Sequence, residues 1–149
     1  MPRLPRRELL PQHGFFHITA RGVAEEAIFR DDADRVVFLA LLGGTVGRFH
    51  WRSHSFCLMS THYHLVIEAQ RALLSAGLHR LNGIYAQHFN RRHGRRGHLF
   101  ADRFAAWLIE SEEHLYAACR YLLLNPVRAG LCHDPAAYLW SGSRYGKIL

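Results

Sequence analysis

Two histidines separated by a single residue, His62 and His64, lie in an apolar stretch that runs from Ser55 to Glu68. Side chains alternate between the two faces of an extended strand, so both imidazoles are expected to project from the same face. Two neighbouring imidazoles can bind one divalent cation, and a strand holds such a pair rigidly. Further along the chain, Tyr121 and Asn125 are four residues apart. A metal-binding pair combined with a tyrosine on a helix suits the chemistry of cutting one DNA strand.

The spacing around Tyr121 predicts which side chains share its side of a helix. At about 100° per residue, Tyr121 and Asn125 fall within about 40° of each other. His114, Ala117 and Ala118 belong to the same stripe. The small alanines, one turn before Tyr121, leave room for a substrate to approach the tyrosine hydroxyl.

Hydrophobic periodicity and turn residues predict the elements that position these side chains. The expected order is strand 15–21, helix 36–42, strand 51–59, strand 62–69, a helix with apolar residues from Leu74 to Phe89 that ends at Gly94, strand 104–109 and a helix that begins after Ser111. We expect the first helix to end near Gly43 and Gly44. We expect the last to end before Pro126, because the residue that precedes a proline disfavours the α region.

The order β-α-β-β-α-β is the ferredoxin-like split βαβ plan of the α+β class, one antiparallel sheet with two helices on one face. An additional C-terminal helix carries the tyrosine. At 149 residues, the chain is expected to be one domain, 1–149, in which 1–13 and 142–149 are loose tails.

The composition is typical of a basic, globular protein. The formal net charge is +7 and the isoelectric point is about 9.9, which favours a polyanionic partner. Four arginines form a compact basic turn and are candidate phosphate contacts: Arg91, Arg92, Arg95 and Arg96.

The apolar run from Val36 to Leu42 is too short to span a bilayer, so no membrane contact and a cytoplasmic location are expected. Cys57, Cys119 and Cys132 are too widely spaced for a zinc knuckle, and three cysteines do not make a disulfide framework. They are expected to be buried thiols in a reducing compartment.

The chain resembles the REP-associated tyrosine transposases of bacteria, which belong to the single-tyrosine transposases with a His-hydrophobic-His motif. The resemblance extends from about Phe16 to Tyr145 and includes several motifs in the same order. These motifs are Phe16–Gly22, Ile28–Asp32, Cys57–Leu65, Arg80–Gly83, Phe89–His93, Gly97–Phe100, Arg103–Phe104 and Tyr121–Gly130.

The resemblance implies a role for each site residue. His62 and His64 correspond to the family's histidine ligands of a divalent metal, Mg²⁺ or Mn²⁺, and Asn125 to the third protein ligand. Tyr121 corresponds to the nucleophile, which attacks single-stranded or hairpin DNA and forms a 5′-phosphotyrosine with a free 3′-hydroxyl. The implied activity is that of an endonuclease and strand transferase, with a monomer favoured over a homodimer.

Arg103 and Arg128 are further candidate DNA contacts. The sequence also departs from the family pattern at two places. Relatives usually carry Pro-Asn or Pro-Glu where this chain has Ser60 and Thr61. They commonly carry Gln-Gly-Arg-Phe-Lys where this chain has Ala101–Ala105, which removes a lysine and adds an acidic residue. Neither change affects a predicted ligand or the tyrosine.

Three other interpretations remain open from the sequence. The protein could be a non-cleaving regulator that binds hairpin DNA, although such a protein has no need of His62, His64, Tyr121 and Asn125 together. It could be a metal-dependent hydrolase in which a metal-bound water attacks and the tyrosine is structural. A ferredoxin-like sensor of small ligands is disfavoured by the positive charge and the histidine pair.

Overall fold

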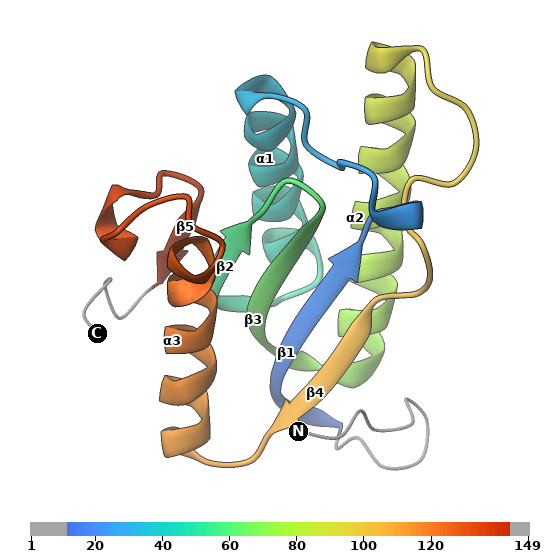
Figure 1. Cartoon of the computed structure of the whole chain (residues 1–149). Helices are drawn as coiled ribbons and strands as arrows, with labels where there is room; N and C mark the ends of the chain where they lie inside the picture. The colour runs from blue at the N-terminus through green and yellow to red at the C-terminus, as the bar shows by residue number, and fades with distance from the viewer. Residues whose placement is uncertain (1–11, 144–149) are drawn as a thin grey trace.

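The structure is a computed structural model that describes residues 12–143. Its elements, drawn in Figure 1, follow in the order β1 (His13–Arg21), η1 (Val23–Glu25), α1 (Asp32–Arg48), β2 (Arg52–Leu58), β3 (His62–Gln70), α2 (Arg71–His93), β4 (Ala105–Ile109), α3 (Glu112–Arg128), η2 (Pro135–Ala137) and β5 (Ser141–Ser143). The strands form one sheet in the order β4-β1-β3-β2-β5, and all neighbouring strands are antiparallel. The predicted ferredoxin-like α+β plan is confirmed, and β5 adds an unpredicted strand beside β2.

The sheet lies between two helical layers. In Figure 1, α1 and α2 cover one face, and α3 packs against the other. The larger core lies under α1 and α2, where Tyr63 and Leu65 of β3 are completely buried. A smaller core lies under α3 and includes Val66 of β3 and Leu122 of the helix. Since side chains alternate along β3, the residues on either side of Tyr63 must face α3.

The prediction that the first helix ends near Gly43 and Gly44 is wrong, because α1 continues to Arg48. Each glycine lowers helix stability by about 1 kcal/mol relative to alanine. Packing offsets this effect, since Leu42 and Thr45 on the same helix are buried. The Thr45 hydroxyl also donates a hydrogen bond of 2.7 Å to a carbonyl one turn earlier in α1.

The last helix begins as predicted but ends later. Ser111 is the N-cap, and its hydroxyl accepts a hydrogen bond of 3.0 Å from the backbone of His114. The expected end before Pro126 is wrong, since α3 continues to Arg128. The proline lacks one backbone donor, but its ring is buried, and the Ala129 N–H still donates to the carbonyl one turn earlier, at 3.0 Å. The extension places Arg128 two turns after Tyr121.

The two predicted tails fall largely on residues 1–11 and 144–149, outside the described residues. Within the described part, His13 already belongs to β1, and Gly142 and Ser143 belong to β5, so these ends form part of the sheet. None of the helices between residues 12 and 143 combines the length and apolar character needed to cross a bilayer.

An ionic cluster joins the end of α2 to the start of α1. The side chain of Asp34 is fully buried and accepts hydrogen bonds from the backbone of Arg30 at 2.9 Å, from Arg92 at 2.7 Å and from His93 at 2.9 Å. Burial alone would raise the pKa of this carboxyl. The three hydrogen bonds outweigh burial and hold the pKa of Asp34 below its usual range.

Replacing Asp34 with alanine should therefore lower the free energy of unfolding by about 3–5 kcal/mol, because Arg92 and His93 lose their shared partner. Urea denaturation followed by circular dichroism measures this change. Asp32→Ala is the matched control on the same helix turn. That carboxylate is exposed, so the midpoint should hardly move. Equal midpoints for the Asp34→Ala and Asp32→Ala proteins would show that the cluster does not stabilise the fold.

A close contact between α2 and the residue before β2 gives a second stability prediction. Gly77 packs against Trp51, and a Cβ at this position would lie 2.4 Å from the indole Cζ2. Gly77→Ala should thus destabilise the protein by about 1–3 kcal/mol through overpacking. Gly83, on the same helix, has open space where a Cβ would lie, so Gly83→Ala should stabilise by up to about 1 kcal/mol. Thermal unfolding should show shifts of opposite sign, and two shifts of the same sign would refute the packing argument.

Candidate active site

The histidine pair lies on the α3 side of the sheet. His64 is 5% exposed and His62 is half-buried, and their ring centroids are 5.1 Å apart. On the neighbouring strand β1, Thr19 lies opposite His64 and Arg21 lies opposite His62. Directly opposed residues of an antiparallel pair share a face, so these four side chains belong to one surface.

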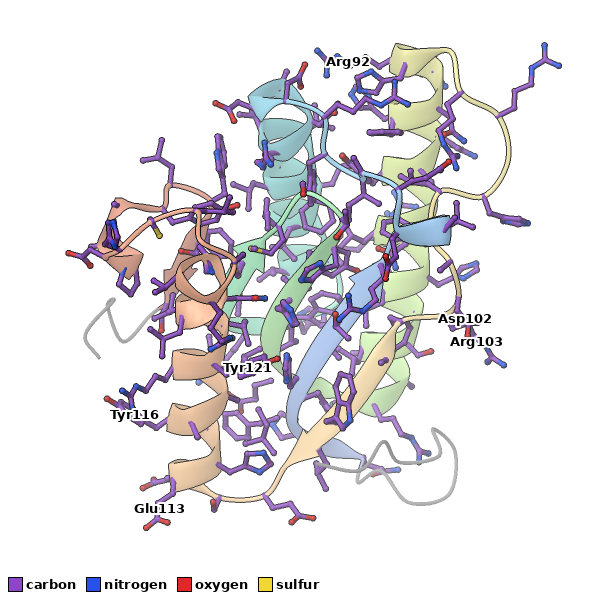
Figure 2. All side chains as sticks on the ribbon, viewed as in Figure 1. Arg92, Asp102, Arg103, Glu113, Tyr116 and Tyr121 are labelled. Atoms are coloured by element: carbon purple, nitrogen blue, oxygen red, sulfur yellow. The ribbon has the colours of Figure 1, made fainter. Side chains whose placement is uncertain are left out.

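The helix α3 brings Tyr121 over this surface. Its ring centroid lies 6.0 Å from that of His64 and 6.0 Å from that of His17 on β1. Figure 2 shows Tyr121 on the side of α3 that faces the sheet. The side chain is 51% exposed, so it is accessible from solvent. Asn125 follows one turn later on the same helix and is half-buried.

Arg128, two turns after Tyr121 on α3, contacts the tyrosine. Its guanidinium carbon lies 4.1 Å from the centroid of the Tyr121 ring, and its Nη2 donates a hydrogen bond of 2.6 Å to the Tyr121 carbonyl. A cation over the face of an aromatic ring is an attractive contact.

His17 is a third histidine of the site. Its Nε2 lies 3.1 Å from Nδ1 of His64, at hydrogen-bond distance, which leaves Nε2 of His64 available to a cation. Burial, and next the nearby His114, lower the pKa of His17 to about 4. The ring centroid of His17 lies 5.3 Å from that of His64 and 5.4 Å from that of Trp107 on β4.

The electrostatic surroundings keep the paired histidines neutral. Burial lowers the pKa of His64 to about 2, with smaller contributions from His17, His62 and two arginines. Burial and the charge of Arg21 lower the pKa of His62 to about 4. A neutral imidazole offers the nitrogen lone pair that a metal ion requires. Two such rings offer nitrogen donors of a kind that suits a divalent cation, and Asn125 lies on the helix that packs against this face.

No cluster of three or more histidine, cysteine or acidic side chains suited to a metal ion occurs among residues 12–143. A cation on His62 and His64 would therefore take further ligands from an amide such as Asn125, from substrate or from solvent. This set, with positions left for other ligands, differs from the closed four-ligand sites of structural zinc.

A cavity of about 420 Å³ opens beside Tyr121, between α3 and strands β1, β3 and β4. Its lining comprises His17, Thr19, Arg21, His64, Trp107, His114, Ala117, Ala118 and Tyr121. The predicted space beside the alanines is thus present. A second cavity, of about 790 Å³, lies between α2 and the segment before β4, and Arg103 contributes to its lining.

The arginines predicted as DNA contacts lie in three places. Arg91, Arg92, Arg95 and Arg96 surround the end of α2. Arg92 pairs with Asp31 and Asp34, and Arg95 pairs with Glu26 at 2.7 Å, whereas Arg91 and Arg96 are exposed. Figure 2 shows Arg92 and Arg103 well away from Tyr121. Arg128 is the member of this predicted set that contacts the tyrosine.

Four residues of the site were not predicted from the sequence: His17, Thr19, Arg21 and Trp107. The alternation of three polar residues along the first predicted strand was a signal that they share a face. Their proximity to the histidine pair depends on the register of β1 against β3, which a single sequence does not reveal.

Comparisons with known proteins identify the family and the fold of the chain. Residues 13–123 match the sequence profile of the family described as "Transposase IS200 like". The fold is similar to that of a REP-associated tyrosine transposase bound to a REP hairpin, with a TM-score of 0.73 and 12% identity over 91% of this chain and 79% of that one. It is also similar to a candidate transposase from Deinococcus radiodurans R1, with a TM-score of 0.54 and 12% identity over 79% of this chain and 95% of that one. No curated protein matches significantly. The family profile spans most of the chain, which therefore belongs to the IS200-like transposases.

Proposed function

We propose that this transposase is a metal-dependent endonuclease and strand transferase that acts on single-stranded DNA at repeats or hairpins and forms a 5′-phosphotyrosine on Tyr121. The observation that carries the proposal is the position of Tyr121, whose ring centroid lies 6.0 Å from that of His64 and which lines the same cavity. The hairpin bound by the structurally similar REP-associated transposase supports the choice of substrate.

His62, His64 and Asn125 are the residues that would hold the cation, Mg²⁺ or Mn²⁺. When bound, the cation would supply Lewis-acid polarisation of the scissile phosphodiester. The Tyr121 oxygen attacks phosphorus in line, the bond to the 3′-oxygen breaks, and the strand that leaves gains a 3′-hydroxyl. The tyrosine loses its proton in this step, and Arg128 packs against its ring at 4.1 Å from the centroid.

Strand transfer follows from the covalent intermediate. The phosphotyrosine bond conserves the energy of the broken phosphodiester, so a different 3′-hydroxyl can attack it and release Tyr121 without ATP. The exposure of Tyr121 is consistent with this exchange, because an incoming strand needs access to the same phosphorus. The positive net charge of the chain would attract both strands.

The test uses the purified protein with end-labelled single-stranded DNA that carries the palindromic repeats flanking its own gene, in Mn²⁺ or in EDTA. Denaturing gels should reveal a protein–DNA adduct in Mn²⁺ and none in EDTA. An oligonucleotide of equal length with the palindrome scrambled is the control substrate. Tight binding without an adduct would favour the non-cleaving regulator. Cleavage without an adduct would indicate a hydrolase in which water attacks.

A further inference from the structure

Strand β1 presents a row of polar side chains to the cavity beside Tyr121. His17, Thr19 and Arg21 alternate along this strand and line the cavity together. Figure 1 shows β1 between β3 and β4, on the sheet that α3 packs against. His17 has a partner in His64, but the mechanism above uses neither Thr19 nor Arg21.

The Thr19 hydroxyl is buried without a hydrogen-bond partner. The residue is only 7% exposed, and within residues 12–143 its Oγ1 contacts no donor or acceptor. Buried hydroxyls in proteins are nearly always hydrogen-bonded, so an unpaired one calls for an explanation. Thr19 lies on the face of the sheet occupied by His64, and the residue lines the cavity.

Arg21 supplies a positive charge at the same cavity. Its side chain is exposed, and in the described part of the chain no acidic group forms an ion pair with it. Arg21 lies directly opposite His62 in the β1–β3 register and lines the same cavity as His64. Unlike Arg92 and Arg95, this guanidinium is available to an anion.

The walls of the cavity fit an extended anionic strand. Trp107 lies on β4, across the cavity from α3, and offers an aromatic face against which an unpaired base can stack. On the α3 side, Ala117 and Ala118 take little space beside Tyr121. A phosphodiester in this cavity would lie between the tyrosine and the polar row of β1.

We propose that Thr19 and Arg21 form a phosphodiester subsite that holds the phosphate attacked by Tyr121. The Arg21 guanidinium binds one non-bridging oxygen, and the Thr19 hydroxyl donates a hydrogen bond to the phosphate. The subsite rests on the proposed function, since it assigns the phosphate that the tyrosine attacks. Both residues bind the phosphate before and during attack. Because they hold that phosphate beside Tyr121, they determine where the strand is cut.

Equilibrium binding to a chemically altered strand tests the subsite directly. The protein carries Tyr121→Phe, EDTA is present, and the probe is the hairpin oligonucleotide with its single-stranded flank. A neutral methylphosphonate replaces each flank linkage in turn. We expect one linkage at which this change weakens binding by about tenfold. With Arg21→Gln added, the loss at that linkage should disappear, which isolates the contact as a double-mutant cycle does.

The salt dependence provides a second measure, since Arg21→Gln should reduce the slope of log affinity against log salt by about 1. Arg48→Gln, at the exposed end of α1, is the matched control that removes one charge elsewhere and should leave the methylphosphonate effect intact. An unchanged methylphosphonate profile in Arg21→Gln would overturn the assignment of Arg21.

Thr19→Val keeps the shape of the side chain and removes only the hydroxyl. Because no hydrogen bond is lost within the protein, the unfolding midpoint should stay the same or rise. The affinity for the hairpin oligonucleotide should fall about fivefold. Thr45→Val is the control, a buried threonine of α1 whose hydroxyl bonds within its helix. A lowered midpoint with unchanged affinity would make the Thr19 hydroxyl structural and overturn its place in the subsite.

The two proposals can fail separately. A wild-type protein that forms no adduct would contradict the proposed chemistry, while the binding cycle would still report a phosphate held by Arg21. An adduct on wild-type protein, combined with a flat methylphosphonate profile, would contradict the subsite and leave the chemistry standing.

Discussion

Tyr121→Phe should lower formation of the covalent protein–DNA adduct by at least about 1,000-fold, because the attacking oxygen is removed. The ring contacts with His64 and Arg128 do not involve the hydroxyl, so the fold and the affinity for hairpin DNA should be unchanged. Denaturing gels measure the adduct, and a filter-binding titration measures the affinity.

Tyr116→Phe is the matched control for this prediction. Tyr116 lies on the same helix and is 55% exposed, but Figure 2 shows it on the side of α3 away from Tyr121. This variant should form the adduct at the wild-type rate. A Tyr121→Phe protein that forms the adduct as fast as the Tyr116→Phe protein would refute the assignment of the nucleophile.

His64→Ala should abolish cleavage in Mn²⁺, with a loss of at least about 100-fold, while much of the DNA affinity remains. The reason is that one of the two neutral imidazoles of the donor set is removed. The affinity of the protein for Mn²⁺ in the absence of DNA, measured by isothermal titration calorimetry, should fall in parallel. This second readout separates loss of a metal ligand from a general loss of activity.

Since His64 is buried, its replacement also leaves a cavity and removes the partner of His17. His62→Ala, at a half-buried position, is therefore the companion variant, and it should lose both Mn²⁺ binding and cleavage. His133→Ala, at an exposed position after α3, should change neither. Full cleavage by both the His62→Ala and His64→Ala proteins would show that the pair is not a metal site.

The order of elements and the sheet plan follow from local patterns in the sequence, but element ends depend on tertiary packing. Gly43 and Gly44 are typical of a helix end, yet the buried face of α1 extends the helix past them. Pro126 is typical of a helix stop, yet α3 continues past it to Arg128, with the proline ring buried. The short strand β5 has only three residues, too few to show a periodicity.

The candidate site was predictable where it depends on local patterns in the sequence. The alternation of residues in β3 places His62 and His64 on one face, and helical spacing places Asn125 near Tyr121. The polar row of β1 was missed because strand register is a long-range property. The basic turn illustrates another limit, since a sequence does not reveal whether an arginine faces phosphate or carboxylate. In the structure, Arg92 and Arg95 bind carboxylates of the chain itself.

The most direct test of the account identifies the amino acid that carries the DNA. Trypsin, which cuts after Arg120 and Arg128, should release from the adduct a peptide of residues 121–128 that contains a single tyrosine. Mass spectrometry after nuclease digestion should find this peptide heavier by a nucleotide linked through its 5′-phosphate, with fragment ions that place it on Tyr121. A nucleotide on any other residue, or strand cleavage with residues 121–128 unmodified throughout, would contradict the account.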